Sequence, residues 1–207
     1  MAGGTVPLSA DLTEPPDPIG LVLFAHGSGS NRHSPRNTYV ADALQESGLA
    51  TLLVDLLTVD EARRDVLTAT YRFDIALLCD RLTAAVEYAR TLTDRPIGLF
   101  GASTGAAAAL MTAARRPHLV AAIVSRGGRP DLAGPALRLV RAPTLLIVGG
   151  ADTTVVKLNR RAFQELTARP CELRIVPGAG HLFEEPGALD TVVRYTVEWF
   201  QHHFTER

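Results

Sequence analysis

The sequence is poor in cysteine, in net charge and in long apolar runs, and each shortage excludes a class of protein. Its two cysteines in 207 residues, Cys79 and Cys171, stand where a helix and a strand would otherwise hold apolar residues. Two isolated cysteines in such places make neither a disulfide framework nor a metal cluster. We expect both to be small buried side chains, and we expect no bound metal.

The charge is almost balanced, with 21 basic and 22 acidic residues and a formal net charge of −1. Such a chain has no field that would attract nucleic acid. The first residues lack the basic and apolar regions of a signal peptide, and no later run reaches the roughly 18 apolar residues of a membrane helix. We therefore expect a cytoplasmic protein with a small-molecule substrate, no nucleic-acid or membrane partner, and a monomeric or homodimeric state.

What the sequence does contain is a repeated alternation of strand and helix patterns. Short runs rich in Val, Ile and Leu are followed by segments with helical spacing, which is typical of a parallel sheet covered on both faces. The predicted strands are residues 19–26, 49–55, 96–102, 120–126, 143–149 and 171–176, and the predicted helices are 35–47, 75–89, 104–116, 153–168 and 188–204. Residues 5–12 resemble an antiparallel edge strand, although the prolines in and after this stretch argue against it.

Two connections decide how the sheet is covered. Residues 127–142 form a connection too short for a separate cap domain. Residues 56–72 form a long, charged connection of the kind that often carries function. We expect an open site that this second segment partly covers as a lid.

The strongest local signal is the G-x-S-x-G pattern of Gly101, Ser103 and Gly105, which follows a predicted strand and opens a predicted helix. This setting is typical of a nucleophile elbow, where a strained turn lifts a serine hydroxyl above the sheet. The glycines avoid collisions with the neighbouring strand and helix. The alternative is a simple Gly-Ser turn between strand and helix.

A serine nucleophile needs a base and a group that orients the base, in the order serine, acid, histidine in this kind of fold. Asp152 follows the strand 143–149, and His181 follows the strand 171–176. Taken alone, Asp152 could serve only as a helix N-cap and His181 could be a surface residue. Together with Ser103, they predict a catalytic triad.

The loop His26-Gly27-Ser28-Gly29-Ser30 follows the first well-defined strand. Acyl transfer builds negative charge on a carbonyl oxygen, and two fixed backbone N–H groups can stabilise that charge. We expect Thr104 to supply one N–H and Ser28 the other, with Gly29 as the less favoured donor. The loop could instead be a flexible turn or hold a phosphate, but it matches neither a P-loop nor a G-x-G-x-x-G fingerprint.

The segments HGSGS, GASTG, GGADTTV and GAGHLF, in this order, resemble the dienelactone-hydrolase-like branch of the α/β-hydrolase superfamily. The likeness covers nearly the whole chain. It implies one α/β-hydrolase domain over residues 1–207, with a three-layer α/β fold, an eight-stranded or slightly reduced and mostly parallel sheet, no large cap domain, and a triad of Ser103, Asp152 and His181. Dienelactone hydrolase itself uses a cysteine nucleophile, so its lactone substrate does not follow from the resemblance.

Several further residues lie where strands or long connections end, and they could contact a substrate. Arginines after the strands could line the entrance and favour an anionic group, or they could be solvated or paired with acidic residues. The candidate substrate contacts are Gly29, Arg32, His33, Arg36, Tyr71, Arg72 and Arg126.

The predicted function is a serine hydrolase that cleaves a carboxylester, lactone or thioester through an acyl-enzyme, without a cofactor. An acyltransferase would use the same residues, and a noncatalytic ligand-binding protein could retain the same fold. An interaction scaffold would instead need a large exposed apolar patch. Retention of all three triad residue types favours catalysis.

Overall fold

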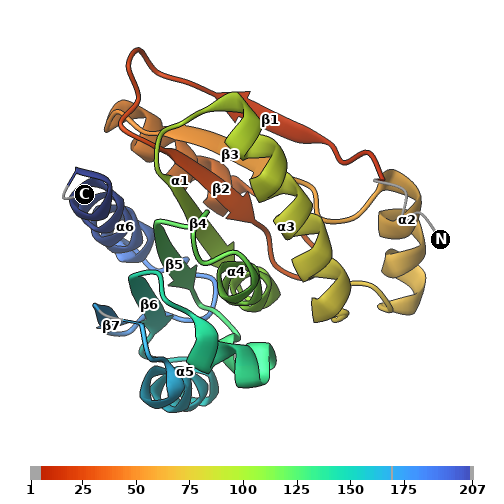
Figure 1. Ribbon diagram of the computed structural model, residues 1–207. Helices are drawn as coiled ribbons and strands as arrows, with labels where there is room; N and C mark the ends of the chain where they lie inside the picture. The colour runs from red at the N-terminus through yellow and green to blue at the C-terminus, as the bar shows by residue number, and fades with distance from the viewer. Residues whose placement is uncertain (1–5, 169, 206–207) are drawn as a thin grey trace.

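The computed structural model describes residues 6–168 and 170–205, which fold around one sheet (Figure 1). The elements alternate between strand and helix along most of the chain. In order they are β1 (Ala10–Thr13), β2 (Leu21–Ala25), α1 (Pro35–Glu46), β3 (Ala50–Val54), α2 (Val59–Thr68), α3 (Ile75–Leu92), β4 (Ile97–Ala102), α4 (Thr104–Arg115), β5 (Ala122–Arg126), the 3₁₀ segment η1 (Pro130–Leu139), β6 (Thr144–Gly149), α5 (Thr153–Glu165), β7 (Cys171–Val176) and α6 (Ala188–Thr205).

The sheet has seven strands among the described residues, in the order β1-β3-β2-β4-β5-β6-β7. All neighbouring strands are parallel except β1, which runs antiparallel to β3. In the parallel strands every carboxyl end therefore lies at the same edge of the sheet. The loops that follow β2, β4, β5, β6 and β7 meet at this edge.

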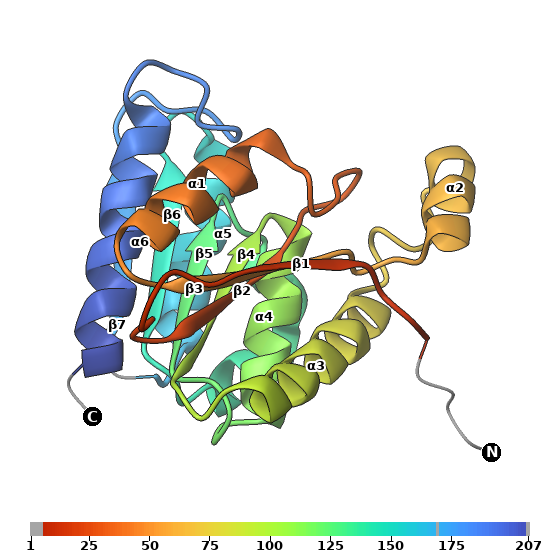
Figure 2. The same ribbon diagram turned by 90° about the horizontal axis from the view of Figure 1, so that it is seen from above.

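Helices cover both faces of the sheet, and each face forms its own apolar core. Residues of α1 and α6 pack on one face, whereas α3, α4, η1 and α5 pack on the other (Figure 2). Because both faces are covered, β2 to β6 are buried along their whole length, which explains their continuous apolar runs. The predicted three-layer fold is confirmed.

The positions of the six main strands and five main helices agree with the sequence prediction to within a few residues at their ends. The edge strand begins later than the pattern suggested, at Ala10, and residue 5 lies outside the described part of the chain. The helix predicted to reach residue 168 ends at Glu165 instead, because Leu166 turns to an extended conformation. Cys79 is buried as expected, but Cys171 is only half-buried because β7 is an edge strand.

The two connections also differ from each other as expected. Residues 130–139 form η1 close to α4 and α5, so no large cap arises there. Residues 56–72 contain α2, a helix that the sequence prediction did not include and that stands away from the sheet (Figure 2). A capping box forms its start, because Thr58 Oγ1 accepts from the Glu61 N–H and the Glu61 side chain accepts from the Thr58 N–H.

Within the described residues, no helix has the length and apolar content needed to span a membrane.

The packing of α6 against β4 gives a test of the core. A side chain at Gly98 would lie 2.5 Å from the ring of Phe200, so Phe200 fills the space above this glycine. Replacing Phe200, which is fully buried, with Ala should lower the free energy of unfolding by about 3–5 kcal/mol in urea denaturation, because it leaves a cavity. The matched variant Phe163→Ala removes a ring that is 38% exposed and should cost about 1 kcal/mol or less. Equal losses in the two variants would contradict the assignment.

Candidate active site

Ser103 lies in a strained turn between β4 and α4, at the carboxyl edge of the sheet. Its backbone has φ 49° and ψ −117°, a combination that non-glycine residues rarely adopt. The turn is held from both sides, because Ser103 N–H donates to Arg126 O (3.3 Å) and Ser103 O accepts from Arg129 N–H (3.0 Å). The end of β5 thus fixes the position of Ser103.

Two glycines make this turn sterically possible. A Cβ at Gly105 would lie 2.2 Å from Ala25 O, and a Cβ at Gly101 would lie 2.5 Å from Ala106 Cα. Both obstacles are backbone atoms, which cannot move aside as a side chain can. The start of α4 therefore lies directly against the end of β2 and brings the loop after β2 beside Ser103.

Asp152 and His181 come from the loops after β6 and β7, and a hydrogen bond of 2.8 Å joins Asp152 Oδ2 to His181 Nδ1. The two loops are tied together by backbone bonds from Gly150 N–H to Val176 O (2.8 Å) and from Ala151 N–H to Ala179 O (2.9 Å). Asp152 also caps α5, because its Oδ1 accepts from the Val155 N–H (3.2 Å). The aspartate is thus anchored by its helix while it orients the imidazole.

Ser103 and His181 line the same cavity of about 180 Å³, together with Ser28 from the loop after β2. Among the described residues no hydrogen bond links Ser103 Oγ to His181, a separation that is common in ligand-free active sites. Among the described residues, no group of three or more His, Cys, Asp or Glu side chains is placed to hold a metal ion.

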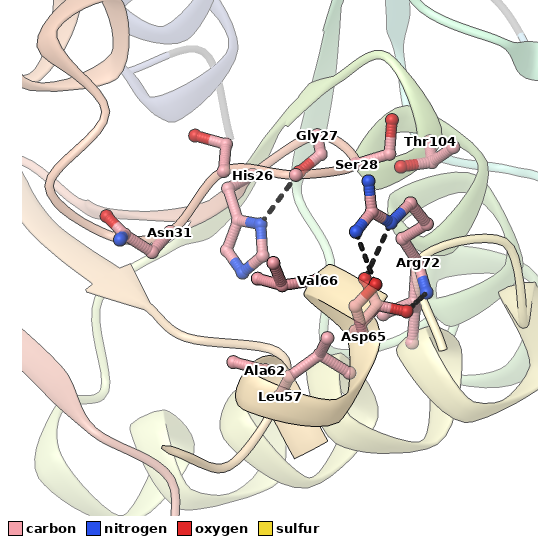
Figure 3. Close-up of a pocket in the computed structure, with 13 residues that line it drawn as sticks. His26, Gly27, Ser28, Asn31, Leu57, Ala62, Asp65, Val66, Arg72 and Thr104 are labelled. Carbon is pink, nitrogen blue, oxygen red and sulfur yellow. Dashed lines mark hydrogen bonds and ion pairs between the residues drawn. The ribbon is translucent and has the colours of Figure 1, made fainter. Parts of the chain in front are cut away.

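The loop after β2 is held by His26, a residue to which the sequence analysis gave no role. His26 Nε2 accepts a hydrogen bond from Leu56 N–H (3.0 Å), so the proton of the neutral ring is on Nδ1. Nδ1–H can then donate to Gly27 O at 3.0 Å, and the same carbonyl accepts from Ser30 N–H (3.2 Å) (Figure 3). Because the peptide bond is planar and trans, fixing the Gly27 carbonyl also fixes the direction of the Ser28 N–H.

The two predicted oxyanion donors lie close to each other. Ser28 and Thr104 both line a second cavity of about 160 Å³, which adjoins the first and shares the loop after β2 with it. Neither the Ser28 nor the Thr104 amide donates a backbone hydrogen bond within the described chain. Neither amide is therefore committed to a backbone acceptor, as an oxyanion donor requires.

This second cavity, which we name the α2 cavity, lies between α2 and the loop after β2 (Figure 3). Its apolar wall consists of Leu57, Ala62, Val66 and Leu78. Residues of the predicted lid segment thus line a cavity next to the predicted oxyanion donors.

The α2 segment is fastened by a buried ion pair. Arg72 Nε donates to Asp65 Oδ2 (2.7 Å), and the backbone N–H groups of Tyr71 and Arg72 donate to Asp65 Oδ1. Burial raises the pKa of Asp65, but the hydrogen bonds from Arg72 and Tyr71 outweigh it and hold this pKa below its usual value. Figure 3 shows the Arg72 guanidinium between Asp65 and the loop after β2.

The remaining predicted substrate contacts lie in three places. Arg32 binds the carboxylates of Asp11 and Asp55, and the exposed His33 lies 3.6 Å from Asp11, so neither lines the cavity of Ser103. Arg72 is held by Asp65, and Gly29 lines the α2 cavity. Arg36 and Arg126 line the cavity of Ser103 and His181.

The profile of a known family, described as the alpha/beta hydrolase fold, matches residues 20–142. The chain belongs to the α/β-hydrolase fold family. A solved structure named dienelactone hydrolase, from Anabaena variabilis, is 53% identical with a TM-score of 0.92, over 98% of this chain and 94% of that one. The resemblance stated from the motifs is thereby confirmed.

More distant and longer relatives complete this comparison. Est1E from Butyrivibrio proteoclasticus shares the hydrolase fold at 17% identity, with a TM-score of 0.80 over 96% of this chain and 95% of that one. Two Mycobacterium tuberculosis proteins, from strains CDC 1551 and H37Rv, are 52% identical over 98% of this chain and are provisionally named phosphoribosyl transferases. The hydrolase chain spans only 45% of the length of these two relatives.

Two residues near Ser103 escaped the sequence analysis. His26 belongs to the quoted HGSGS segment, but its role depends on the distant Leu56 N–H. Asn37, in α1, is 1% exposed and accepts a hydrogen bond from Arg126 Nη2 (3.3 Å). The sequence shows that Asn37 is a polar residue in the first turn of a predicted helix. It does not show that Arg126 is its partner.

His26 gives a pH-dependent test. Burial lowers the pKa of His26, and this effect exceeds the opposing effects of the Gly27 hydrogen bond and Asp55. Below about pH 6.5 the unfolded histidine binds a proton that the folded one does not, so the free energy of unfolding should fall as the pH drops from about 7.5 to 5.5. His26→Asn should show a smaller fall in urea denaturation than the wild type.

The matched control is His118→Asn, which alters an exposed histidine. It should show the same fall as the wild type. A wild-type slope that persists in His26→Asn would assign the pH dependence to other groups.

Proposed function

We propose that the protein is a serine hydrolase of small ester-like substrates, with Ser103 as nucleophile, His181 as base and Asp152 as the residue that orients the base. The observation that carries this proposal is that Ser103 and His181 line one cavity while His181 is hydrogen-bonded to Asp152. His181 Nε2 takes the proton of Ser103 Oγ as this oxygen attacks a carbonyl carbon, and Asp152 holds the other ring nitrogen in its protonated form.

The attack produces a tetrahedral intermediate with a negative oxygen. The N–H groups of Ser28 and Thr104 stabilise this oxygen, which contributes a few kcal/mol to lowering the barrier. His181 then gives its proton to the leaving group, and an acyl-enzyme forms on Ser103. A water molecule, activated by His181, releases the acyl group and restores the serine.

The longer relatives bear on the substrate rather than on the fold. We propose that this chain corresponds to a hydrolase unit of those proteins, which are more than twice its length. Because these relatives are provisionally named phosphoribosyl transferases, sugar phosphates are one class of molecule to test as substrates of this unit. Hydrolysis is preferred to phosphoribosyl transfer here because the residues brought together suit acyl chemistry.

The first test removes the nucleophile. Ser103→Ala should abolish labelling by a fluorophosphonate probe and lower the hydrolysis rate of para-nitrophenyl acetate by about 10⁴- to 10⁶-fold, because nothing replaces the attacking oxygen. The control Ser9→Ala changes an exposed serine in the segment before β1 and should leave both readouts intact. A folded wild type that neither labels nor hydrolyses would favour the ligand-binding alternative, and efficient transfer to an added alcohol would favour an acyltransferase.

The second test separates the two roles of Asp152. In Asp152→Asn the side chain can still cap α5, because asparagine caps helices as well as aspartate does. It would no longer stabilise the protonated imidazole, so kcat should fall by about 10⁴-fold while the melting temperature hardly changes. The measurement pairs steady-state kinetics with thermal unfolding.

Asp74→Asn is a matched control, since Asp74 caps α3 through the Leu77 N–H (3.0 Å) in the same way. It should leave kcat unchanged. A similar loss of activity in both variants would point to a general effect of the aspartate-to-asparagine change and would contradict a specific role of Asp152 in orienting His181.

A further inference from the structure

The cavity that holds Ser103 and His181 is basic, and no carboxylate stands among its lining residues. Arg126 and Arg36 line it together with Ser28, Ser30 and Ser34. Two acidic residues bond to this lining without belonging to it: Asp152 binds His181, and the mostly exposed Glu184 binds Arg36. The cavity therefore offers positive charge and hydrogen-bond donors without an internal anion.

Arg126 is the unusual member of this group. Its residue is only 6% exposed, yet it forms no ion pair with an acidic residue in the described chain. Nη2 donates to Asn37 Oδ1 (3.3 Å), the guanidinium carbon lies 6.0 Å from the centre of the Phe183 ring, and Nε has no hydrogen-bond partner among the described residues. Burying a cation without a counter-ion costs folding free energy, so its presence points to a functional role.

Other part-buried arginines of the same protein do have counter-ions. Arg72 pairs with Asp65, Arg81 pairs with Glu61, and Arg129 pairs with Asp131. In each of these pairs a carboxylate neutralises the part-buried guanidinium. At Arg126 the hydrogen-bond partner is a neutral asparagine, and Arg126 lines the cavity of Ser103.

Arg36 brings a second positive charge close to the first. Its side chain is 31% exposed, its Nη1 donates to Glu184 Oε1 at 3.3 Å, and its Nε is buried without a partner among the described residues. Burial, and then the repulsion from Arg36, lower the pKa of Arg126 to about 10. At neutral pH the Arg126 guanidinium therefore remains charged, and an anion between Arg126 and Arg36 would relieve their repulsion.

The amount of charge favours one kind of anion. A carboxylate carries a single charge on two oxygens, whereas a phosphate monoester carries about −1.5 to −2 at pH 7 on three acceptor oxygens. Two guanidinium groups, of which only Arg36 shares its charge with a mostly exposed carboxylate, match the phosphate better. The serine hydroxyls of the same cavity can serve the additional oxygens.

We propose that the cavity of Ser103 contains a phosphate subsite formed by Arg126 and Arg36, so that the substrate is a small ester or lactone bearing a phosphate group. This assignment deepens the proposed serine hydrolysis and rests on it. The scissile carbonyl binds at Ser103, and the phosphate itself undergoes no reaction. Its binding places the ester relative to the nucleophile and selects charged substrates over neutral ones.

The experiment compares three acetate esters that differ in one substituent. They are para-acetoxyphenyl phosphate, para-acetoxybenzoate and para-methylphenyl acetate, and each kcat/KM is divided by the spontaneous hydrolysis rate to remove leaving-group effects. For the wild type we expect a preference of about 10- to 100-fold for the phosphate over the neutral ester. Arg126→Gln should abolish this preference by lowering kcat/KM for the phosphate ester and not for the other two esters. Arg36→Gln should reduce the preference.

Two further variants control for charge and folding. Arg126→Lys keeps the positive charge and should retain part of the preference, whereas Arg161→Gln removes a distant exposed charge on α5 and should retain all of it. Thermal unfolding identifies any variant that fails to fold, in which case Arg36→Gln, at a half-exposed position, carries the test. A wild type that favours the neutral ester or the benzoate overturns the proposal, as does a folded Arg126→Gln that loses all three activities equally.

A separate measurement distinguishes failure of the subsite from failure of the hydrolase. If the wild type hydrolyses none of the esters and Ser103 is not labelled, the proposed function has failed. Calorimetric titration with inorganic phosphate then tests the subsite without turnover. Saturable binding that Arg126→Gln removes supports the subsite, and absence of binding at millimolar phosphate overturns it.

Discussion

The contact between the start of α4 and the end of β2 determines the arrangement of everything around Ser103. Backbone lies against backbone there, and a Cβ at Gly105 would lie 2.2 Å from Ala25 O. This approach fixes the strained Ser103 turn and brings the His26–Ser30 loop to it. The β5 end secures the same turn through Arg126 O and Arg129 N–H. Backbone contacts alone therefore bring three chain segments together at one point.

Charge around this point is distributed unevenly. On the side of α2, Asp65 neutralises Arg72 within a compact buried pair. On the side of α1 and β5, Arg126 and Arg36 converge with little compensation. On the α2 side the charges are therefore neutralised and the wall is apolar. The opposite side carries a net positive charge. For the proposed ester substrate, this asymmetry implies a preferred orientation in the site.

Local patterns explain why much of this could be predicted from the sequence. Parallel strands buried on both faces must be apolar throughout, and a turn such as Gly101–Gly105 needs its glycines. Both features can therefore be recognised in the sequence. Pairing between residues far apart in the sequence cannot be recognised in this way. Arg32 pairs with Asp11 and Asp55, whereas the Arg126 side chain donates to Asn37 and lies near the Phe183 ring. Nothing in the sequence distinguishes these two arginines. The α2 helix was missed although Thr58 and Glu61 carry its capping signal, because its weak apolar pattern resembles a loop.

The helix α2 has only one buried residue, Asp65, whereas Val66 is 76% exposed and still lines the α2 cavity. Substitutions on α2 can therefore reshape this wall at little cost to the folded state, since surface changes usually alter stability by about 0.5 kcal/mol or less. The sheet and the Ser103 turn allow no comparable freedom. Under the proposed function, the preference for whatever part of a substrate enters the α2 cavity can therefore change through α2 while the Ser103 turn stays as it is.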